Sequence, residues 1–255
     1  MKVFAGPWIG EFGWELFHWQ GVLRQLHDNG MDITICTSES SFDLYRDFCT
    51  DFVQIIPGTE TDAWRCNNWK PNITLENVTK KLGAIISPED ICPGEPNPRE
   101  QKLIKYGHKD DKLISNDIII HARATNKCNS AERNWPVEKW EQLIDMIPQE
   151  FTVGCIGKKD SAYLIDGCDD MLDVDLGFLA NFLQKSKLVL GPSSGPIHFA
   201  SLCGVPHMVW SGYDARRNRW RYEDFWNPFN TKVHFLDCGW NPSVAYIYEE
   251  LMGLL

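Results

Sequence analysis

The sequence predicts an α/β protein with parallel sheets in two halves, and three observations support this prediction. Short apolar runs alternate with amphipathic stretches along all 255 residues, and 43% of the residues are hydrophobic, which is enough for a sizeable core. The clearest unit, at residues 188–210, passes from an apolar run through a Gly-Pro-Ser-Ser-Gly turn and a helical stretch to a second apolar run. That order is typical of a strand–helix–strand unit in an open parallel sheet.

The first half of the chain begins with a short strand at residues 2–5, followed by a glycine-bearing loop at 6–13. An amphipathic helix is expected next, over 14–28, because apolar residues recur at helical spacing until Asn29-Gly30. Further strands are expected at 33–36 and 53–56, and further helices at 42–48 and 75–82. A Trp-rich, irregular stretch covers residues 59–71.

Several prolines between residues 87 and 101 mark a linker or surface loop, after which the alternation resumes. Strands are expected at 117–121, 151–156, 188–190 and 205–210, and helices at 136–147, 176–184, 196–203 and 243–255. Pro136 and Pro196 each fall in the first turn of a helix, where a missing N–H group costs nothing. This alternation predicts parallel sheets in both halves.

Composition excludes several classes of protein. The formal net charge of −10 disfavours a generic binder of nucleic acids or anionic membranes, although it is compatible with a local basic patch. The nine cysteines, without a C-x-x-C pair, favour reduced thiols in a cytoplasmic protein over a disulfide framework or a zinc site. No apolar run approaches the length of a membrane span, and no metal site is expected.

The turn before the helix at 196–203 is the strongest candidate binding site. Ser193, Ser194 and Gly195 place hydroxyl groups and unpaired backbone N–H groups at a helix N-terminus, where a phosphate group binds favourably. His198 follows one turn into the helix. The alternatives are a plain serine cap that binds nothing, and a core His198 that bonds to the backbone.

Three further motifs precede this turn in a characteristic order. A strand ends at His121, a Trp-Pro motif opens the helix at 136–147, and another strand ends at Gly157. In this order the motifs resemble the C-terminal domain of the ADP-heptose:lipopolysaccharide heptosyltransferases, glycosyltransferase family nine. The resemblance covers residues 117–212 well and about the first 25 residues weakly. It implies a compact GT-B architecture of two Rossmann-like halves.

The resemblance also implies a domain organisation and a reaction. It assigns residues 1–100 to an acceptor-side domain, 101–240 to a nucleotide-sugar-binding domain, and 241–255 to a C-terminal helix that packs back across the halves. The implied reaction is inverting, metal-independent transfer of a sugar from a nucleotide-sugar donor to a hydroxyl acceptor, which is a glycan or a lipopolysaccharide-like molecule. The nucleotide sugar is a substrate, and no cofactor is implied.

Glu11 is the candidate catalytic base, because it occupies the position of the family's acidic residue in the first loop. It lies between Gly10 and Gly13, which are expected to bind the acceptor or an anion, because loops at the carboxyl ends of parallel strands face the ligand crevice. A carboxylate there can take the proton of the acceptor hydroxyl. If Glu15, one turn on, lies close to Glu11, one of the two pKa values rises. The alternative is that Glu11 complements the helix dipole.

Basic residues near strand ends are the candidates for binding the donor. Arg123, Lys127 and Arg133 follow the strand that ends at His121, and a bidentate guanidinium suits a diphosphate. The resemblance favours Arg133, beside the Trp-Pro motif, and places Gly157-Lys158 against the base or ribose of the nucleotide. The alternative for the arginines is a solvated loop.

An arginine-rich stretch is the unusual feature of this acidic chain. Four arginines fall within six residues and are interleaved with Trp220 and Tyr222: Arg216, Arg217, Arg219 and Arg221. We expect at least two of them to contact an anionic ligand, either the donor or an anionic acceptor. The alternative is salt bridging to the acidic stretch at 166–175.

Two rival functions stay open at this point. A phage-type DNA glycosyltransferase acting on hydroxymethylated bases would use the arginine-rich stretch, although the net charge opposes it. A non-catalytic binder of sugar nucleotides or glycans would keep the fold without the reaction. The family has Asp where this chain has Ser193, and a basic residue where it has Asn134, so the donor sugar and the acceptor also stay open.

Overall fold

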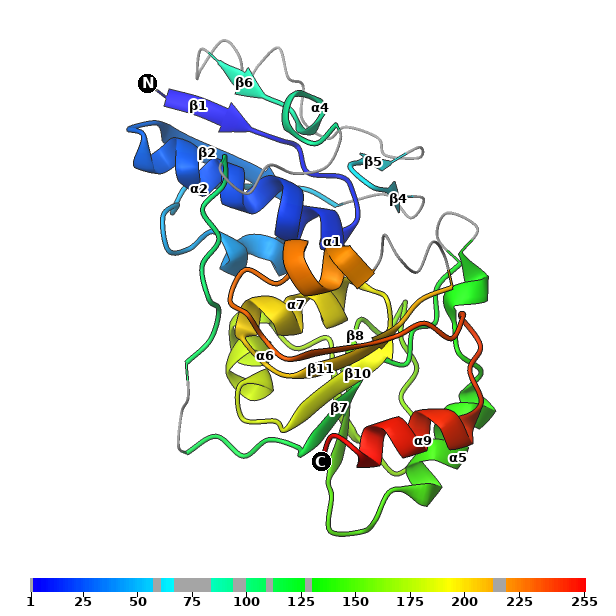
Figure 1. Cartoon of the computed structure of the whole chain (residues 1–255). Helices are drawn as coiled ribbons and strands as arrows, with labels where there is room; N and C mark the ends of the chain where they lie inside the picture. Colours follow the sequence, from blue (N-terminus) through cyan, green and yellow to red (C-terminus); the bar gives the residue numbers. More distant parts are fainter. Residues whose placement is uncertain are drawn as a thin grey trace. The chain divides into compact units, whose positions relative to one another are not determined.

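The computed structural model describes residues 2–56, 61–66, 84–93, 100–108, 112–126, 130–212 and 219–255. The chain divides into two compact units, Met1–Ile104 and Lys105–Leu255, and each contains its own parallel sheet (Figure 1). The predicted α/β class with two parallel-sheet halves is confirmed. The predicted domain boundaries, and the acceptor-side and donor-side roles, stay predictions.

The sheet of the first unit is built from β1 (Lys2–Ala5), β2 (Asp32–Thr37), β3 (Phe52–Gln54) and β6 (Ile85–Ile86), in the order β3-β2-β1-β6. All of these pairs are parallel, and the register places Val3 opposite Ile33. β1 is buried after its first residue, as its apolar sequence predicts. A separate antiparallel hairpin joins β4 (Thr61–Asp62) to β5 (Arg65–Cys66) within the stretch expected to be irregular.

The helical segments of the first unit differ from the expected ones. Three successive segments replace the single helix expected over 14–28: α1 (Phe12–Trp14), the π-helical η1 (Glu15–Trp19) and α2 (Gln20–Asp28). Apolar spacing indicates a helical face but not a local change to i→i+5 hydrogen bonds. The helix expected at 42–48 is a 3-10 segment, η2 (Glu39–Leu44), whose serines favour turns over helix interiors. A short helix, α4 (Pro88–Ile91), lies in the expected linker, and the helix expected at 75–82 lies outside the described residues.

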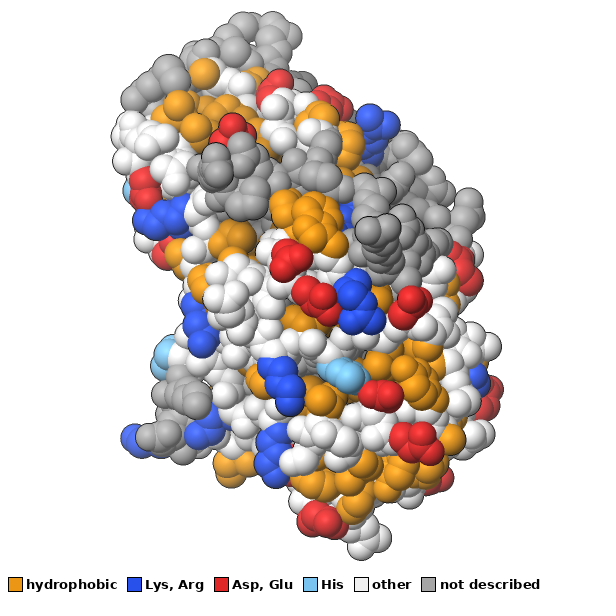
Figure 2. Space-filling model, viewed as in Figure 1, with side chains coloured by type: hydrophobic (Ala, Val, Ile, Leu, Met, Phe, Trp, Pro, Cys, Tyr) orange, Lys and Arg blue, Asp and Glu red, His pale blue; other side chains and the backbone are white. Residues whose placement is uncertain are grey.

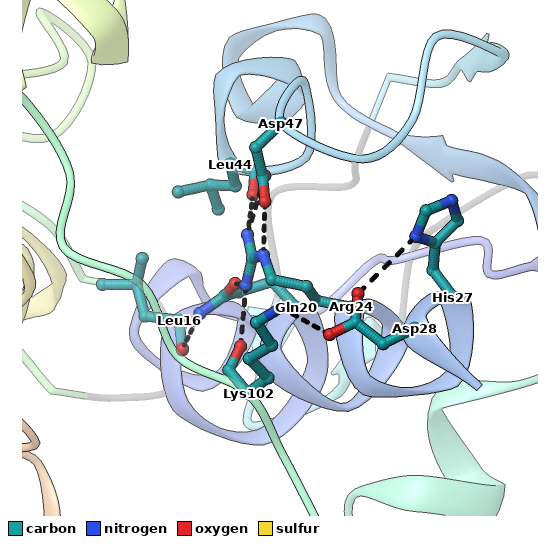
Figure 3. Close-up of polar contacts among 8 residues, drawn as sticks. All are labelled: Leu16, Gln20, Arg24, His27, Asp28, Leu44, Asp47 and Lys102. Carbon is teal, nitrogen blue, oxygen red and sulfur yellow. Dashed lines mark hydrogen bonds and ion pairs between the residues drawn. The ribbon is translucent and has the colours of Figure 1, made fainter. Parts of the chain in front are cut away.

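The buried guanidinium of Arg24 ties three segments of the first unit together (Figure 3). It forms a bidentate pair with Asp47, at 2.6 Å from Nε to Oδ2 and 3.0 Å from Nη2 to Oδ1. It also donates to the carbonyl oxygens of Leu44 (2.8 Å) and Lys102 (3.0 Å), and to the side chain of Gln20. A buried cation needs partners of this kind, so Arg24 holds α2, the end of η2 and the segment at 100–104 in place.

The sheet of the second unit follows the order β12-β11-β10-β7-β8-β9, and all of its pairs are parallel. Its strands are β7 (Ile118–Ile120), β8 (Val153–Gly157), β9 (Asp169–Leu172), β10 (Leu188–Pro192), β11 (His207–Trp210) and β12 (Val233–Leu236). The four strands expected from apolar runs are present. The sequence does not predict β9 or β12, because Asp169-Asp170 and His234 interrupt their apolar character.

The principal helices of the second unit begin within one residue of their expected starts: α5 (Val137–Met146), α6 (Leu176–Leu183), α7 (Gly195–Cys203) and α9 (Val244–Met252). A cluster of buried tryptophans, Trp135, Trp140 and Trp210, fills the core under α5. α9 packs beside α5 (Figure 1) and contributes Ile247 and Leu251 to the same core. The packing of α9 across the other half stays a prediction.

Three further observations concern the surface charges, the cysteines and the length of the helices. On the face drawn in Figure 2, Lys and Arg side chains are scattered among acidic and neutral ones rather than gathered into one continuous area. Seven cysteines are free thiols: Cys36, Cys49, Cys92, Cys155, Cys168, Cys203 and Cys238. Of the helices in the described part of the chain, none is long and apolar enough to cross a membrane.

Candidate functional site

The strand order of the second unit reverses between β7 and β10, and polar side chains gather where these two strands end. The chain runs outward from β7 through β8 to β9, and then from β10 through β11 to β12 on the other side. In open parallel sheets the carboxyl ends of the strands at such a reversal form the ligand crevice. His121 follows β7, and Ser193 and Ser194 connect β10 to α7. The turn expected to bind phosphate therefore lies where the topology favours a ligand.

A buried hydrogen bond joins the ends of β7 and β10. His121 Nδ1 lies 2.8 Å from the hydroxyl oxygen of Ser194, and both side chains are buried. Burial, with smaller contributions from Arg123 and Arg133, lowers the pKa of His121 to about 3, so its imidazole is neutral near pH 7. The Ser194 hydroxyl is therefore already engaged within the protein.

Gly157 makes room for Ala162 and His121. Its φ is +135°, and an added Cβ would lie 2.6 Å from Ala162 Cβ and 3.1 Å from His121 Cδ2. Glycine adopts that backbone conformation without strain and permits so close an approach. This packing explains the glycine, while the expected contact of Gly157-Lys158 with a nucleotide stays a prediction. Lys158 is exposed.

Arg133 reaches the turn from the segment after β7. Its Nη2 donates to the carbonyl oxygen of Ser193 at 2.5 Å, and its guanidinium carbon lies 5.3 Å from the ring centre of Trp240. Trp240 in turn packs on Gly212, where an added Cβ would lie 2.4 Å from Trp240 Cδ1. Ser193 is half-buried, whereas Ser194 is buried. The structure thus brings together Arg133 and the turn that the sequence singled out separately.

Arg123 braces its own loop. Its Nη1 donates to the carbonyl oxygens of Thr125 (3.1 Å) and Ser130 (2.9 Å) and to the side chain of Asn134, and its Nη2 donates to the Ser130 hydroxyl at 2.6 Å. The side chain is buried. These bonds favour a structural role for Arg123 over the expected contact with the donor. Lys127 lies outside the described residues.

His198 and Tyr222 lie on another side of the turn. Their rings stack with centroids 4.9 Å apart, and His198 Nε2 lies 3.2 Å from the phenol oxygen. The Tyr222 hydroxyl donates to Ser193 Oγ at 2.9 Å. Tyr222 belongs to the π-helical segment η5 (Arg221–Phe225), which the sequence does not predict. In the sequence, the position of Tyr222 among the arginines is the only sign of a role for this residue.

The arginine-rich stretch is described only in part, because Arg216 and Arg217 lie outside the described residues. Arg219 pairs with Glu223 at 3.0 Å, donates to the carbonyl oxygen of Phe235 at 3.3 Å and stacks over the Phe235 ring. The carboxylate of Glu223 therefore balances the positive charge of Arg219. The expected contact of at least two of these arginines with an anionic ligand stays a prediction.

Glu11 lies at the start of α1 in the first unit, on the loop that follows β1. It is half-buried, its N–H donates to the carbonyl oxygen of Ala63 at 2.6 Å, and its carbonyl accepts from the N–H of Glu15 at 3.1 Å. Gly10 permits this packing, because an added Cβ would lie 2.2 Å from the Ala63 oxygen. Gly13 lies within α1. The tip of the β4–β5 hairpin thus covers the loop on which Glu11 lies.

Glu15 is a buried carboxyl group that the sequence did not single out for burial. Hydroxyl groups of Thr37 (2.8 Å), Ser41 (2.8 Å) and Tyr45 (2.6 Å) donate to it. Burial raises the pKa of Glu15 to about 7, although the three hydrogen bonds lower it. Desolvation raises this pKa, and not the expected second carboxylate.

Both acids of the Asp-x-Asp sequence at residues 173–175 accept backbone hydrogen bonds. Asp173 accepts from the N–H of Lys159 at 3.1 Å, and Asp175 caps α6 by accepting from the N–H of Phe178 at 2.7 Å. Within the described ranges, no three His, Cys, Asp or Glu side chains gather into a group that could hold a metal ion.

Comparison with known proteins finds structural likeness only. By sequence, the chain matches no protein-family model and no curated protein. By structure, it is similar to the ADP-heptose LPS heptosyltransferase II of E. coli, with a TM-score of 0.61 at 13% identity, covering 100% of this chain and 98% of that one. It is also similar to the glycosyl transferase family 9 protein of Veillonella parvula, with a TM-score of 0.55 at 12% identity, covering 99% and 89%.

A third similar structure is the dodecameric, iron-containing heptosyltransferase TibC of enterotoxigenic E. coli in complex with ADP-D-β-D-heptose. Its TM-score is 0.57 at 15% identity, and the match covers 93% of this chain but 63% of the TibC chain. Identities this low establish a shared fold and nothing finer. The resemblance to glycosyltransferase family nine is confirmed at that level: the chain has the two-sheet GT-B fold of these heptosyltransferases.

Proposed function

We propose that the protein is a glycosyltransferase that moves a sugar from a nucleotide-sugar donor to a hydroxyl acceptor. The observation that carries the proposal is the site at the β7–β10 reversal, where Arg133 and the half-buried Ser193 lie at the N-terminus of α7. The fold shared with heptosyltransferases supports the same class of reaction.

The donor diphosphate is proposed to bind at this helix N-terminus. The N–H groups of Gly195 and Ile197 belong to the first turn, whose N–H groups have no partner within the helix. Together with the Ser193 hydroxyl and the Arg133 guanidinium, they favour negative charge. Such groups stabilise the charge that develops on the diphosphate as the bond to the sugar breaks.

The proposed transfer is a single displacement with inversion. The acceptor oxygen forms a bond to the anomeric carbon, the bond from that carbon to the phosphate oxygen breaks, and Glu11 takes the acceptor proton. We prefer Glu11 to Glu15 because Glu11 is half-buried, whereas Glu15 is 2% exposed and engaged by three hydroxyl groups. Metal independence, a glycan or lipopolysaccharide-like acceptor, and a cytoplasmic location are proposed from the resemblance and the composition.

The test is release of nucleoside diphosphate from ADP-, CDP-, GDP- and UDP-linked sugars by the purified chain, measured by chromatography. We expect turnover of at least one donor, and its loss in Gly195→Val, which blocks close approach to the helix N-terminus. Gly253→Val is the matched control, because a Cβ at Gly253 meets only ordinary contacts.

The other outcomes of this test favour one of the two rival functions or contradict the proposed function. Binding of a nucleoside diphosphate without turnover favours the non-catalytic binder. Transfer to hydroxymethylated DNA, with a KM that rises steeply with salt, favours the DNA glycosyltransferase. Binding and turnover of none of the four donor classes contradicts the proposed function.

A further inference from the structure

Tyr222 connects η5 to the turn at the N-terminus of α7 through its hydroxyl group. The side chain is 1% exposed, and its ring is held by stacking on His198 and by an edge contact with Trp226. The phenol oxygen lies 2.9 Å from Ser193 Oγ and 3.2 Å from His198 Nε2. A buried aromatic side chain of this kind needs polar partners for its hydroxyl, and these partners all belong to the candidate donor site.

The hydrogen bonds of the phenol can be counted. A phenol has one proton to donate, and Tyr222 donates it to Ser193. His198 must therefore donate from Nε2 to the phenol oxygen, which assigns the Nε2–H tautomer to this histidine. Burial raises the pKa of Tyr222 above its ordinary value, so the phenol keeps its proton at neutral pH.

This count fixes the direction of the Ser193 hydroxyl. Its oxygen accepts from Tyr222, so its own proton points away from the phenol. The backbone of Ser193 is also fixed, because its N–H donates to the carbonyl oxygen of Trp210 at 2.9 Å and its carbonyl accepts from Arg133. The hydroxyl proton is thus the donor that a half-buried Ser193 offers to a ligand.

We propose that Tyr222 is a positioning residue, which turns the Ser193 hydroxyl proton toward the diphosphate of the donor. The inference rests on the proposed function, because it assumes that a diphosphate binds at the N-terminus of α7. Phenylalanine would fill the same space against His198 and Trp226, but it would leave Ser193 free to rotate. The tyrosine hydroxyl, rather than the ring, therefore carries the effect.

The experiment is a double-mutant cycle on nucleoside diphosphate affinity, measured by calorimetry with ADP, CDP, GDP and UDP. Ser193→Ala removes the hydrogen bond to a charged group and should weaken binding about tenfold. Tyr222→Phe removes only the orientation of that hydrogen bond, so it should weaken binding by up to about tenfold. The double variant should bind no more weakly than Ser193→Ala alone. Tyr246→Phe, which removes a phenol hydroxyl from α9, should leave the affinity unchanged.

The alternatives give different results. If the two effects multiply to about a hundredfold, Tyr222 acts independently of Ser193 and the inference is wrong. If Tyr222→Phe lowers the melting temperature but leaves the affinity unchanged, the hydroxyl is structural only, and the inference is again wrong. Binding of none of the four nucleotides to the wild type contradicts the proposed function itself, together with this inference.

Discussion

The first strand of each sheet is followed by polar groups of opposite character. In the second unit, β7 leads to the neutral His121, which bonds to the Ser194 hydroxyl before α7, while Arg133 donates to the neighbouring Ser193 carbonyl. In the first unit, β1 leads to the carboxyl groups of Glu11 and Glu15. Yet the two sheets share the same strand order around their first strand. β2 and β3 lie on one side of β1 and β6 on the other, while β8 and β9 lie on one side of β7 and β10 on the other.

Since the two sheets share this topology, the different charge at their strand ends comes from the sequences of the loops. The second unit offers hydrogen-bond donors that suit an anion, whereas the first offers the half-buried carboxylate of Glu11, which suits a proton acceptor. A transferase for a phosphorylated donor needs both. The predictions below test whether each unit has the character assigned to it, from the largest expected effect to the smallest.

The largest effect should follow from removing the proton acceptor of the first unit. Glu11→Gln keeps the size of the side chain but removes its basicity, so kcat should fall about 100- to 10,000-fold while nucleoside diphosphate affinity stays unchanged. Steady-state kinetics and calorimetry measure the two quantities. Glu138→Gln, at an exposed position of α5, is the control. Retention of more than about a third of kcat would remove Glu11 from the role of base.

The second effect concerns the buried cation of the first unit. Arg24→Ala leaves Asp47 and two carbonyl oxygens without their partner, so the free energy of unfolding should fall by about 3–5 kcal/mol. Arg46→Ala is the matched control, because Arg46 pairs with Asp43 while 63% exposed, and it should cost less than about 1 kcal/mol. Urea unfolding measures both. Equal losses in the two variants would show that the Arg24 network adds nothing beyond a surface pair.

The third effect is a dependence of protein stability on pH that comes from Glu15. The folded-state pKa of Glu15, about 7, lies above its ordinary value of 4.5, so between these values the folded protein holds a proton that the unfolded chain releases. Stability from this group is therefore greatest below about pH 4.5 and is lost as the pH rises to about 7.

Glu15→Gln should remove this dependence. Relative to the variant, the wild type should lose on the order of 3 kcal/mol in free energy of unfolding between pH 4.5 and pH 8. Urea unfolding at the two pH values measures it. A difference that is the same at both pH values would mean that Glu15 titrates at its ordinary pKa.

The sequence predicted the frame of the second unit better than the details of its site. Leu188 to Trp210 has an uninterrupted apolar–turn–helix–apolar pattern, and β10, α7 and β11 follow it closely. The contact between Tyr222 and Ser193 spans 29 residues and depends on a π-helical segment, for which periodicity gives no signal. A lone Gly157 indicates a close approach but not its partners, which are Ala162 and His121.

The first unit was predicted less well, for related reasons. Glu15 lies in an amphipathic stretch where an acid is expected to face solvent, and its burial depends on hydroxyl groups 22 to 30 residues away. Glu11 was assigned from a resemblance, and its role stays a proposal. Arg24 has the sequence context of a surface residue, and only the tertiary structure brings Asp47 and Lys102 to it.

The proposed function depends most on an anion site in the second unit. Titration of nucleoside diphosphates into wild type and Arg133→Ala tests that site most directly. Arg133 donates to Ser193 beside the helix N-terminus, so its loss should weaken binding about 10- to 100-fold. Arg46→Ala, the same change at an exposed position of the first unit, should leave the affinity within about twofold. Equal affinity of wild type and Arg133→Ala, or no binding of any nucleoside diphosphate, would contradict the account.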